Sequence, residues 1–218
     1  MSENYTGDVT VGGPSDRRRL PGLTITKLAV GDYDNNAYLL TDPVSGQAVL
    51  VDAAAEPERL RELVAGVELR AVVTTHGHRD HHAALAAIVE ETGAHPIAHP
   101  DDAADLPVPV QRRVSHGDTI EVGSQTLEVV HLRGHTPGGI ALVWRGAHPH
   151  VFSGDSLFPG GVGNTWSDAE RFGRLIDDVE ERLFAVLPDD AWVYPGHGKD
   201  TTLGVERPHL AEWRARGW

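Results

Sequence analysis

The sequence contains no cysteine, and this absence limits the chemistry available to the protein. Disulfide bonds and thiolate metal ligands are both excluded, so a transition-metal site would depend on imidazole and carboxylate groups. The absence of disulfides is also compatible with a reducing compartment. Candidate ligands therefore have to be sought among the 13 histidines and 32 acidic residues.

Long apolar runs and an excess of positive charge are missing as well. No stretch approaches the ~20 apolar residues of a membrane-spanning helix, and residues 1–22 lack the apolar centre of a signal peptide. The net charge of −13 repels phosphate backbones and anionic membranes. We therefore expect a cytoplasmic protein that acts on a small molecule and binds neither nucleic acid nor membrane. The sequence gives no indication of its oligomeric state.

The length of 218 residues suits one large domain. Residues 1–22 are polar and include Gly12-Gly13-Pro14 and the basic run Arg17-Arg18-Arg19. This composition predicts a poorly ordered N-terminal tail with solvated arginines. Residues 23–218 are predicted to form a single domain.

Apolar periodicity indicates two halves, each of which runs from strands to helices. The first half contains strand patterns at 23–28, 37–40, 48–51 and 71–74, with helices at 57–65 and 81–92. The second contains strands at 119–122, 126–132, 140–144, 150–152 and 191–194, with helices at 167–187 and 209–214. The sequence Ser167-Asp168-Ala169-Glu170 predicts a capping box. This order favours an α/β (α+β) fold with two sheets packed face to face and helices outside.

One short segment, His76-Gly77-His78-Arg79-Asp80-His81, concentrates four metal-donor side chains within six residues. Such a density of polar groups is costly in a core and has no purpose on a surface. In an extended backbone His76 and His78 point the same way and would hold one ion. Asp80 and His81 lie past the bend and would reach a second ion. Each ion still needs further donors.

Three isolated motifs supply the remaining donors, and each follows an apolar strand. A lone histidine in such a motif is more often a surface residue, but the ordered set favours a metal centre. Together with the cluster they offer five imidazoles and two carboxylates, which suit two adjacent cations. We predict Zn²⁺, with iron or manganese as alternatives, and hydrolysis as the chemistry of such a pair. The motifs are Gly134-His135-Thr136-Pro137-Gly138, Ser153-Gly154-Asp155-Ser156 and Pro195-Gly196-His197-Gly198.

With these motifs the chain resembles the metallo-β-lactamase-fold hydrolases, and within them glyoxalase II (hydroxyacylglutathione hydrolase). The resemblance covers about residues 23–200 and also includes 34–38, Val51-Asp52 and 152–158. It implies an αββα four-layer sandwich, and it implies that Asp52 steadies the ligand loop through hydrogen bonds. It further implies a ligand set of His76, His78 and His135 for one metal, Asp80, His81 and His197 for the other, and Asp155 between them.

The activity implied by the resemblance is hydrolysis of a thioester or related ester by a metal-bridging hydroxide, which Asp80 orients while it ligates. Asn164 stands where the family has a lysine that meets the glutathione carboxylate. Phe158 stands where related lactonases place a tyrosine, and it lacks the hydroxyl that helps to hold a lactone. Trp166, beside the glycine-rich loop, and Lys199 are the other candidates for substrate contact.

Several alternatives remain open at this stage. A persulfide dioxygenase of the same fold would use a single iron, and a β-lactamase or lactonase would share the fold; Asp155 favours the glyoxalase II type over a β-lactamase. A nuclease would need a basic surface, which this acidic chain lacks. A non-catalytic binding module would use metal only for stability. Such a structural site saturates its coordination with protein atoms, whereas seven donors around two ions leave room for water.

Overall fold

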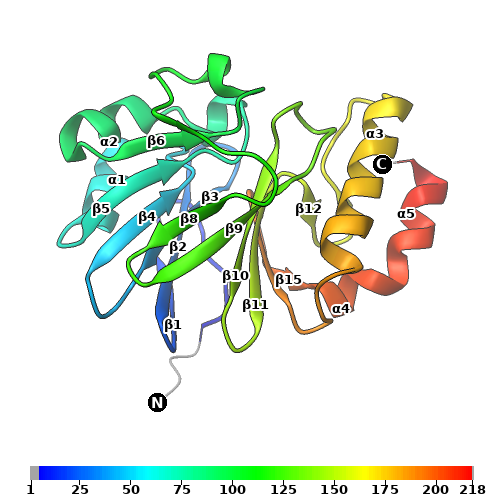
Figure 1. The fold of residues 1–218 in the computed structure, drawn as a ribbon, viewed down its shortest axis with the longest axis horizontal. Helices are drawn as coiled ribbons and strands as arrows, with labels where there is room; N and C mark the ends of the chain where they lie inside the picture. The colour runs from blue at the N-terminus through cyan, green and yellow to red at the C-terminus, as the bar shows by residue number, and fades with distance from the viewer. Residues whose placement is uncertain (1–4, 218) are drawn as a thin grey trace.

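The computed structural model describes residues 5–217, in which two β-sheets lie between two groups of helices (Figure 1). The first sheet has the strand order β1-β2-β3-β4-β5-β6-β7 and the second the order β15-β14-β11-β10-β9-β8. The strands of the first sheet are β1 Asp16–Leu20, β2 Leu23–Val30, β3 Asn35–Thr41, β4 Gln47–Val51, β5 Glu68–Val73, β6 His95–Ala98 and β7 Arg112–Arg113. Those of the second are β8 Thr119–Val122, β9 Gln125–His131, β10 Ile140–Arg145, β11 Pro149–Gly154, β14 Trp192–Pro195 and β15 Thr201–Thr202. A separate ribbon pairs β12 Leu157–Phe158 with β13 Gly161–Val162.

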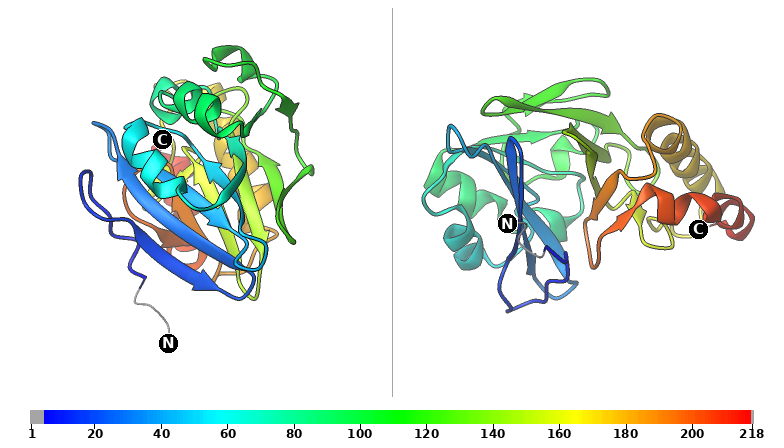
Figure 2. Two further views of the ribbon diagram at one scale, coloured as in Figure 1. Left: turned by 90° about the vertical axis from the view of Figure 1, so that its left-hand side faces the viewer. Right: turned by 90° about the horizontal axis from the view of Figure 1, so that it is seen from below.

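Helices cover the outer face of each sheet (Figures 1 and 2). The helices α1 and α2 lie on the first sheet, and α3 and α5 lie beside the second. The helix α3 continues into a π-helical segment, and short 3₁₀ turns link other elements. The bounds are α1 Pro57–Val64, α2 Leu85–Thr92, α3 Ala169–Val179, π-helix η3 Glu180–Phe184, α4 Leu203–Glu206, α5 Leu210–Arg216, and 3₁₀ turns η1 Arg79–His81, η2 Ala103–Asp105 and η4 Arg207–His209.

The alternation of side chains along each strand builds this layering, because neighbouring residues point to opposite faces of a sheet. On β3, Leu40 belongs to the cluster between the sheets, whereas Leu39 belongs to the cluster under α1 and α2. On β10, Leu142 faces the first sheet and Val143 packs with α3. Three apolar layers thus separate four layers of secondary structure, which confirms the expected αββα sandwich.

Both sheets mix parallel and antiparallel pairs. Parallel neighbours have their carboxyl ends at the same edge of the sheet, and three of the four donor motifs follow these ends. The strands β4 and β5 are parallel neighbours, as are β11 and β14. Three backbone hydrogen bonds then join the sheets beyond these ends: Ile140 N donates to Thr75 O (2.9 Å), Asn36 N to Gly196 O (2.7 Å), and Gly198 N to Asp34 O (3.3 Å). The loops that carry the donor motifs therefore meet at one edge of the sandwich.

The prediction of a disordered tail over residues 1–22 is wrong for the part that the structure describes, and residues 1–4 lie outside it. The strand β1 pairs with β2 from Asp16 to Leu20. Arg18 lies 4.2 Å from the ring centroid of Trp192 and donates to the Tyr194 hydroxyl (3.0 Å). The composition suggested solvated arginines because the contacts of Arg18 with the distant Trp192 and Tyr194 leave no local signal.

The predicted capping box at Ser167 is also wrong. Asp168 is the N-cap of α3, and its Oδ1 accepts hydrogen bonds from the backbone N–H groups of Glu170 (2.9 Å) and Arg171 (3.1 Å). Ser167 lies outside the helix with a φ of 59°. The helix predicted to begin at His81 begins instead at Leu85, after the 3₁₀ turn η1.

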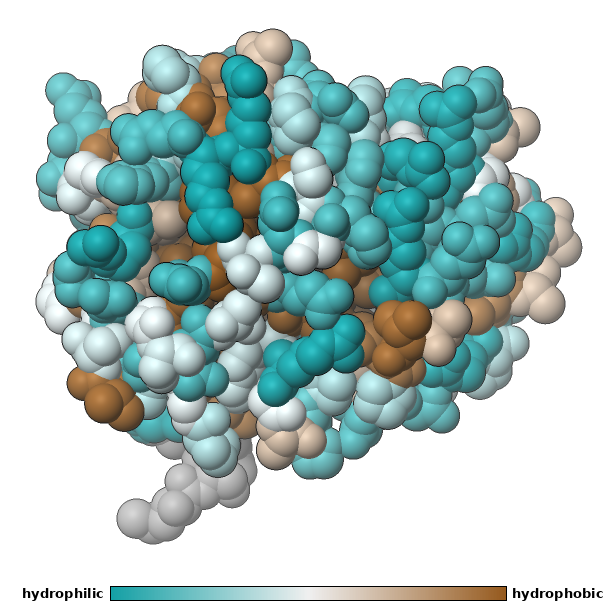
Figure 3. All heavy atoms as spheres, in the orientation of Figure 1, coloured by the Kyte–Doolittle hydropathy of each residue, from teal (hydrophilic) through white to brown (hydrophobic). Residues whose placement is uncertain are grey.

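The surface is dominated by hydrophilic side chains on the face drawn in Figure 3, with hydrophobic residues showing in small patches between them. This distribution fits the acidic composition of the chain. Within residues 5–217, no helix has the length and hydropathy needed to cross a membrane.

A buried ion pair fixes the N-terminal segment against the second sheet. The Lys27 ammonium is completely buried and donates to Asp200 Oδ1 (2.7 Å) and to the carbonyls of Gly7 (2.8 Å) and Gly198 (2.7 Å). Asp200 Oδ2 accepts from the Tyr5 hydroxyl (2.6 Å) and from Trp192 Nε1 (2.9 Å). Each charge is fully hydrogen-bonded, which is the condition under which a buried pair is tolerated.

We predict that Lys27→Met lowers the free energy of unfolding by ~3–5 kcal/mol, because it leaves the Asp200 carboxylate buried without a counter-charge. Arg70→Gln is the matched control, since its pair with Glu68 is more than half exposed and should contribute below ~1 kcal/mol. Denaturant unfolding of the metal-free proteins measures both. Equal losses in the two variants would contradict the role assigned to the pair.

Candidate metal centre

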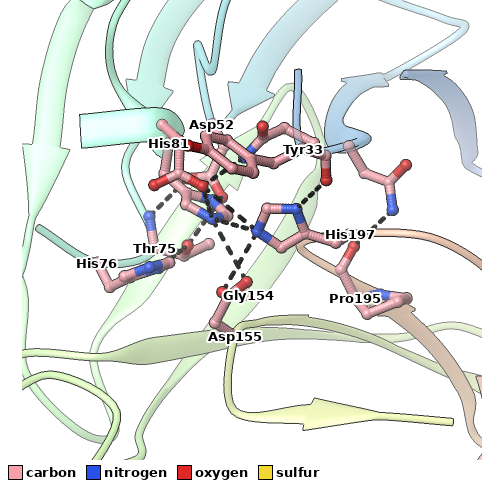
Figure 4. A network of polar contacts seen from close by, with 12 residues as sticks. Tyr33, Asp52, Thr75, His76, His81, Gly154, Asp155, Pro195 and His197 are labelled. Atoms are coloured by element: carbon pink, nitrogen blue, oxygen red, sulfur yellow. Dashed lines mark hydrogen bonds and ion pairs between the residues drawn. The ribbon is translucent and has the colours of Figure 1, made fainter. Parts of the chain in front are cut away.

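Four segments deliver the predicted donors to one place. His76 and His78 follow β5, and Asp80 and His81 lie in or beside the η1 turn directly after them. The other three donors each come from a different loop: His135 lies between β9 and β10, Asp155 follows β11, and His197 follows β14. Figure 4 shows His76, His81, Asp155 and His197 turned toward a common centre.

Six of the seven donors, the five histidines and Asp80, form two groups, which are called the histidine groups below. The ligand atoms of His76, His78 and His135 all lie within 4.8 Å of one another, and so do those of Asp80, His81 and His197. Distances within a group of this size are spanned by one cation with nitrogen ligands at ~2.0–2.1 Å. The two groups are the sets that the resemblance implied.

Asp155 lies between the two groups. Its Oδ2 is 3.5 Å from His135 Nε2 and 3.3 Å from His197 Nε2, while its Oδ1 is 3.4 Å from His81 Nε2. The carboxylate therefore faces ligands of both groups at once. This is the geometry that a bridging ligand requires.

The polar atoms at the centre have the character of metal ligands. His76 Nε2, His135 Nε2 and Asp155 Oδ1 are buried and have no hydrogen-bond partner among the described residues. Leaving such atoms unpaired is costly, so a native structure normally satisfies them. Divalent cations bound by imidazole and carboxylate would satisfy all three, and the residues present thus fit a two-metal centre.

Hydrogen bonds on the outer side fix the orientation of the imidazoles. The Nδ1–H of His81 donates to Asp52 Oδ2 (2.8 Å), that of His135 to the Asn164 carbonyl (2.8 Å), and that of His197 to the Tyr33 carbonyl (2.7 Å). A histidine that donates from Nδ1 presents its Nε2 lone pair on the opposite side. All three rings therefore offer Nε2 to the centre.

Asp52 holds two parts of the ligand loop. In addition to His81, it accepts from the backbone N–H of Thr75 (2.7 Å) and from the Thr75 hydroxyl (2.8 Å). That hydroxyl lies 3.1 Å from His76 Nδ1 and has its own proton engaged with Asp52, so it accepts from His76. These contacts would let Asp52 steady the loop, and its role beside a metal stays a prediction.

Electrostatics divides the imidazoles into two kinds. Burial lowers the pKa of His135 to about 4 and holds the pKa of His76 well below its usual range, so both are neutral donors at pH 7. Burial also opposes a charge on His81, but the Asp52 and Asp155 carboxylates outweigh it and raise the pKa to about 10. Asp155 likewise raises the pKa of His197 against its desolvation. Cations binding here would replace the protons of His81 and His197 as the positive charges beside Asp155.

Two glycines leave the space that Asp155 occupies. A Cβ atom on Gly196 would lie 2.1 Å from Asp155 Oδ1, and one on Gly163 would lie 1.8 Å from the Asp155 carbonyl oxygen. Real Cβ atoms do not approach other atoms so closely. Both positions therefore require glycine, which explains why His197 is preceded by one.

Two residues of the site were not found from the sequence. Asn35 Nδ2 donates to Asp80 Oδ2 (2.9 Å). The Asp102 carboxylate accepts from Gly77 N (2.8 Å) and from Gly138 N (2.6 Å), so it ties the His76–His78 loop to the His135 loop. Asn35 opens the conspicuous Asn-Asn-Ala-Tyr segment, but Asp102 lies in an ordinary polar stretch that carries no signal.

The predicted substrate-contacting residues have different surroundings. Trp166 stacks on His135 (centroids 5.3 Å apart), and the Phe158 ring centroid lies 6.3 Å from that of His197. The Asn164 side chain accepts from Trp166 N (2.7 Å). Lys199 lies 3.5 Å from Asp8, a contact that does not involve the metal ligands. Substrate contact by these four residues stays a prediction.

Arg171 supports the His135 loop from α3. Its Nε donates to the Gly134 carbonyl (2.8 Å), and its Nη2 donates to the His135 carbonyl. Its guanidinium also lies 4.6 Å from the ring centroid of Trp166, which stacks on His135. Trp166 adopts a φ of 54°, an uncommon conformation for a bulky residue. Arg171 thus contacts both the backbone that carries this ligand and the ring that covers it.

Comparisons with known proteins agree with this geometry. Residues 30–197 match the family model of the metallo-beta-lactamase superfamily. The chain is 38% identical over 167 residues to a hydroxyacylglutathione hydrolase of Polaromonas sp. (strain JS666), a match that covers 76% of this chain and 62% of that protein. The chain thus spans less than two thirds of that relative.

Two solved structures share both fold and sequence with the chain. ETHE1 from Myxococcus xanthus superposes with a TM-score of 0.77 at 30% identity, covering 88% of this chain and 84% of that one. TTHA1623, solved in a di-iron-bound form, superposes with a TM-score of 0.67 at 33% identity, covering 83% and 96%.

We predict that Arg171→Gln weakens metal binding at the group containing His135 by at least ~10-fold, the usual effect of losing a residue that orients a ligand. Arg174→Gln is the control: it lies one helical turn away and, among residues 5–217, pairs only with exposed Glu170. Competition with a chromogenic chelator measures both affinities, and unfolding curves check that both variants fold. Equal affinities in the two variants would refute a positioning role for Arg171.

Proposed function

Because the chain belongs to the metallo-beta-lactamase superfamily, we propose that it is a metal-dependent hydrolase that holds two divalent cations. The observation that carries this proposal is the placement of Asp155, whose two oxygens lie 3.3–3.5 Å from ligands of both histidine groups. We propose Zn²⁺ as the metal, with iron or manganese as alternatives, because all three accept imidazole and carboxylate. The relative solved in a di-iron form supports keeping iron in the test.

A pair of divalent cations in this centre would supply Lewis-acid activation of water and of a substrate carbonyl. The chain's own residues supply the orientation. Asn35 donates to Asp80 Oδ2, which also lies 3.5 Å from His81 Nε2 and from His197 Nε2. This contact fixes the rotation of the carboxylate, so that Oδ1 would accept a hydrogen bond from the attacking water and orient it. Asp80 therefore acts as both ligand and orienting group in the proposal.

The bond cleaved is proposed to be a thioester. A thiol ordinarily has a pKa of ~8.5, so its thiolate leaves without a strong proton donor, whereas an amine requires one. Each carboxylate and imidazole described at the centre either is a proposed metal ligand or forms a hydrogen bond that orients one. None of them is therefore left to act as a dedicated proton donor. The name of the Polaromonas relative, a hydroxyacylglutathione hydrolase, supports thioesters as the first class to test.

A second candidate is a mononuclear-iron enzyme of the persulfide dioxygenase kind. The ligand atoms of His76, His81 and Asp155 lie within 4.8 Å of one another. Two imidazoles and one carboxylate are the ligand set of non-haem iron oxygenases. This interpretation needs one metal and leaves part of the donor set unused, so it ranks second.

We expect metal-free protein reloaded with Zn²⁺, Fe²⁺ or Mn²⁺ to release thiol from a hydroxyacylglutathione thioester, and to act more slowly on a lactone and a cephalosporin. A thiol reagent follows the release, and an oxygen electrode with a glutathione persulfide tests the second candidate. Oxygen uptake with one iron per chain would replace the hydrolase proposal. Hydrolysis of the cephalosporin alone would show that the enzyme acts on β-lactams and would contradict the thioester proposal.

The biological setting is also a proposal. We propose a cytoplasmic enzyme of small molecules that works without nucleic acid or membrane, on the basis of its acidic charge. Fractionation of cells that express the protein from its natural gene would test the location.

A further inference from the structure

A pocket of about 620 Å³ opens directly beside the metal ligand Asp80. Three loops line it, those after β2, after β4 and around η1. Its apolar lining comes from Ala54, Ala55 and Ala83, and its polar lining includes Tyr33 and Arg79. A pocket of this size accommodates a small molecule, and its position places one end of that molecule next to the metal centre.

Arg79 is the only cationic residue among those that line this pocket. Within residues 5–217, its guanidinium makes no ion pair or hydrogen bond to another side chain or carbonyl. Its backbone is fixed between two ligands, because His81 N donates to His78 O (3.0 Å) and His82 N donates to Arg79 O (3.1 Å). The backbone that carries this unpaired cation is thus held beside the centre.

The acidic residues of the pocket do not neutralise Arg79. Glu56 Oε1 accepts from Gly31 N (2.8 Å), and its Oε2 lies 3.5 Å from Arg59. Asp80 faces the centre and accepts from Asn35. The third acidic residue, Asp32, is exposed at the loop after β2 and makes no ion pair with Arg79 in the described structure.

We propose that this pocket binds a carboxylate-bearing arm of the substrate and that Arg79 is its charge partner. This inference rests on the proposed hydrolase and adds the substrate class: thioesters that carry a carboxylate a few bonds from the scissile carbonyl. Guanidinium and carboxylate match in geometry and form charge-assisted hydrogen bonds. The alanine methyl groups would contact the aliphatic part of the same arm.

Two thioesters that differ in one charge provide the test: S-acetyl-3-mercaptopropionate, and its neutral counterpart S-acetyl-3-mercaptopropionamide. The readout is the ratio of kcat/KM for the anionic over the neutral substrate. We expect this ratio to fall at least ~10-fold in Arg79→Gln, the range of a lost charge-assisted hydrogen bond. Arg79→Lys should retain part of the ratio, and added salt should reduce it in the natural protein.

Two controls match this change. Arg70→Gln removes an exposed arginine that pairs with Glu68 away from the pocket, and its ratio should equal that of the natural protein. Asp32→Asn removes a negative charge from the pocket, and it should keep or raise the ratio. An unchanged ratio in Arg79→Gln, or an equal fall in Arg70→Gln, would overturn the proposal.

A binding measurement separates this proposal from the proposed function. Calorimetry of the metal-loaded protein with 3-(methylthio)propionate and its amide reports recognition of the carboxylate without turnover. If neither thioester is hydrolysed, the hydrolase proposal fails, while a weaker binding of the acid in Arg79→Gln still supports the pocket. If the acid and the amide bind the natural protein equally, the pocket proposal fails whatever the activity.

Discussion

The Asp155 carboxylate is the contact on which the centre depends, because it faces both histidine groups from the loop after a strand of the second sheet. The first group of donors, after β5, belongs to the first sheet. A bridging carboxylate therefore works only if the two sheets are held in one relative position. The apolar layer between them and the backbone hydrogen bonds at their common edge supply that constraint. The packing of the two sheets therefore determines the geometry of the centre.

Precision in the centre comes from groups outside the two donor sets. Asp52, the Asn164 carbonyl and the Tyr33 carbonyl each take the outer N–H of one imidazole, so each ring has a single orientation. Asp102 joins two ligand loops by their backbones. Buried donors held in this way lose little freedom when a cation binds, which is how a preorganised site gains affinity. The backbone hydrogen bonds of the η1 turn likewise hold the main chain of Arg79 beside Asp80.

The sequence predicts what local patterns encode. Alternating and apolar runs located most strands of both sheets, and the donor motifs identified all seven side chains that the structure brings together. The failures have more than one cause. The polar composition concealed the hairpin of β1 with the neighbouring β2, and β7 and β15 are only two residues long, too short to show a pattern. Asp102 is 25 residues from Gly77 and 36 from Gly138, and no periodicity links such positions. Ser167 matched a capping pattern, but the neighbouring Asp168 is the residue that caps the helix.

Metal content tests the central claim most directly. Metal-free protein is titrated with Zn²⁺, bound metal is counted by elemental analysis after removal of the excess, and Asp155→Ala is treated in parallel. We predict two tightly bound equivalents per chain in the natural protein and a weakened pair in the variant, since each group would lose a shared oxygen ligand. A natural protein that saturates at one equivalent, or a variant that retains two with the same affinity, would contradict the account.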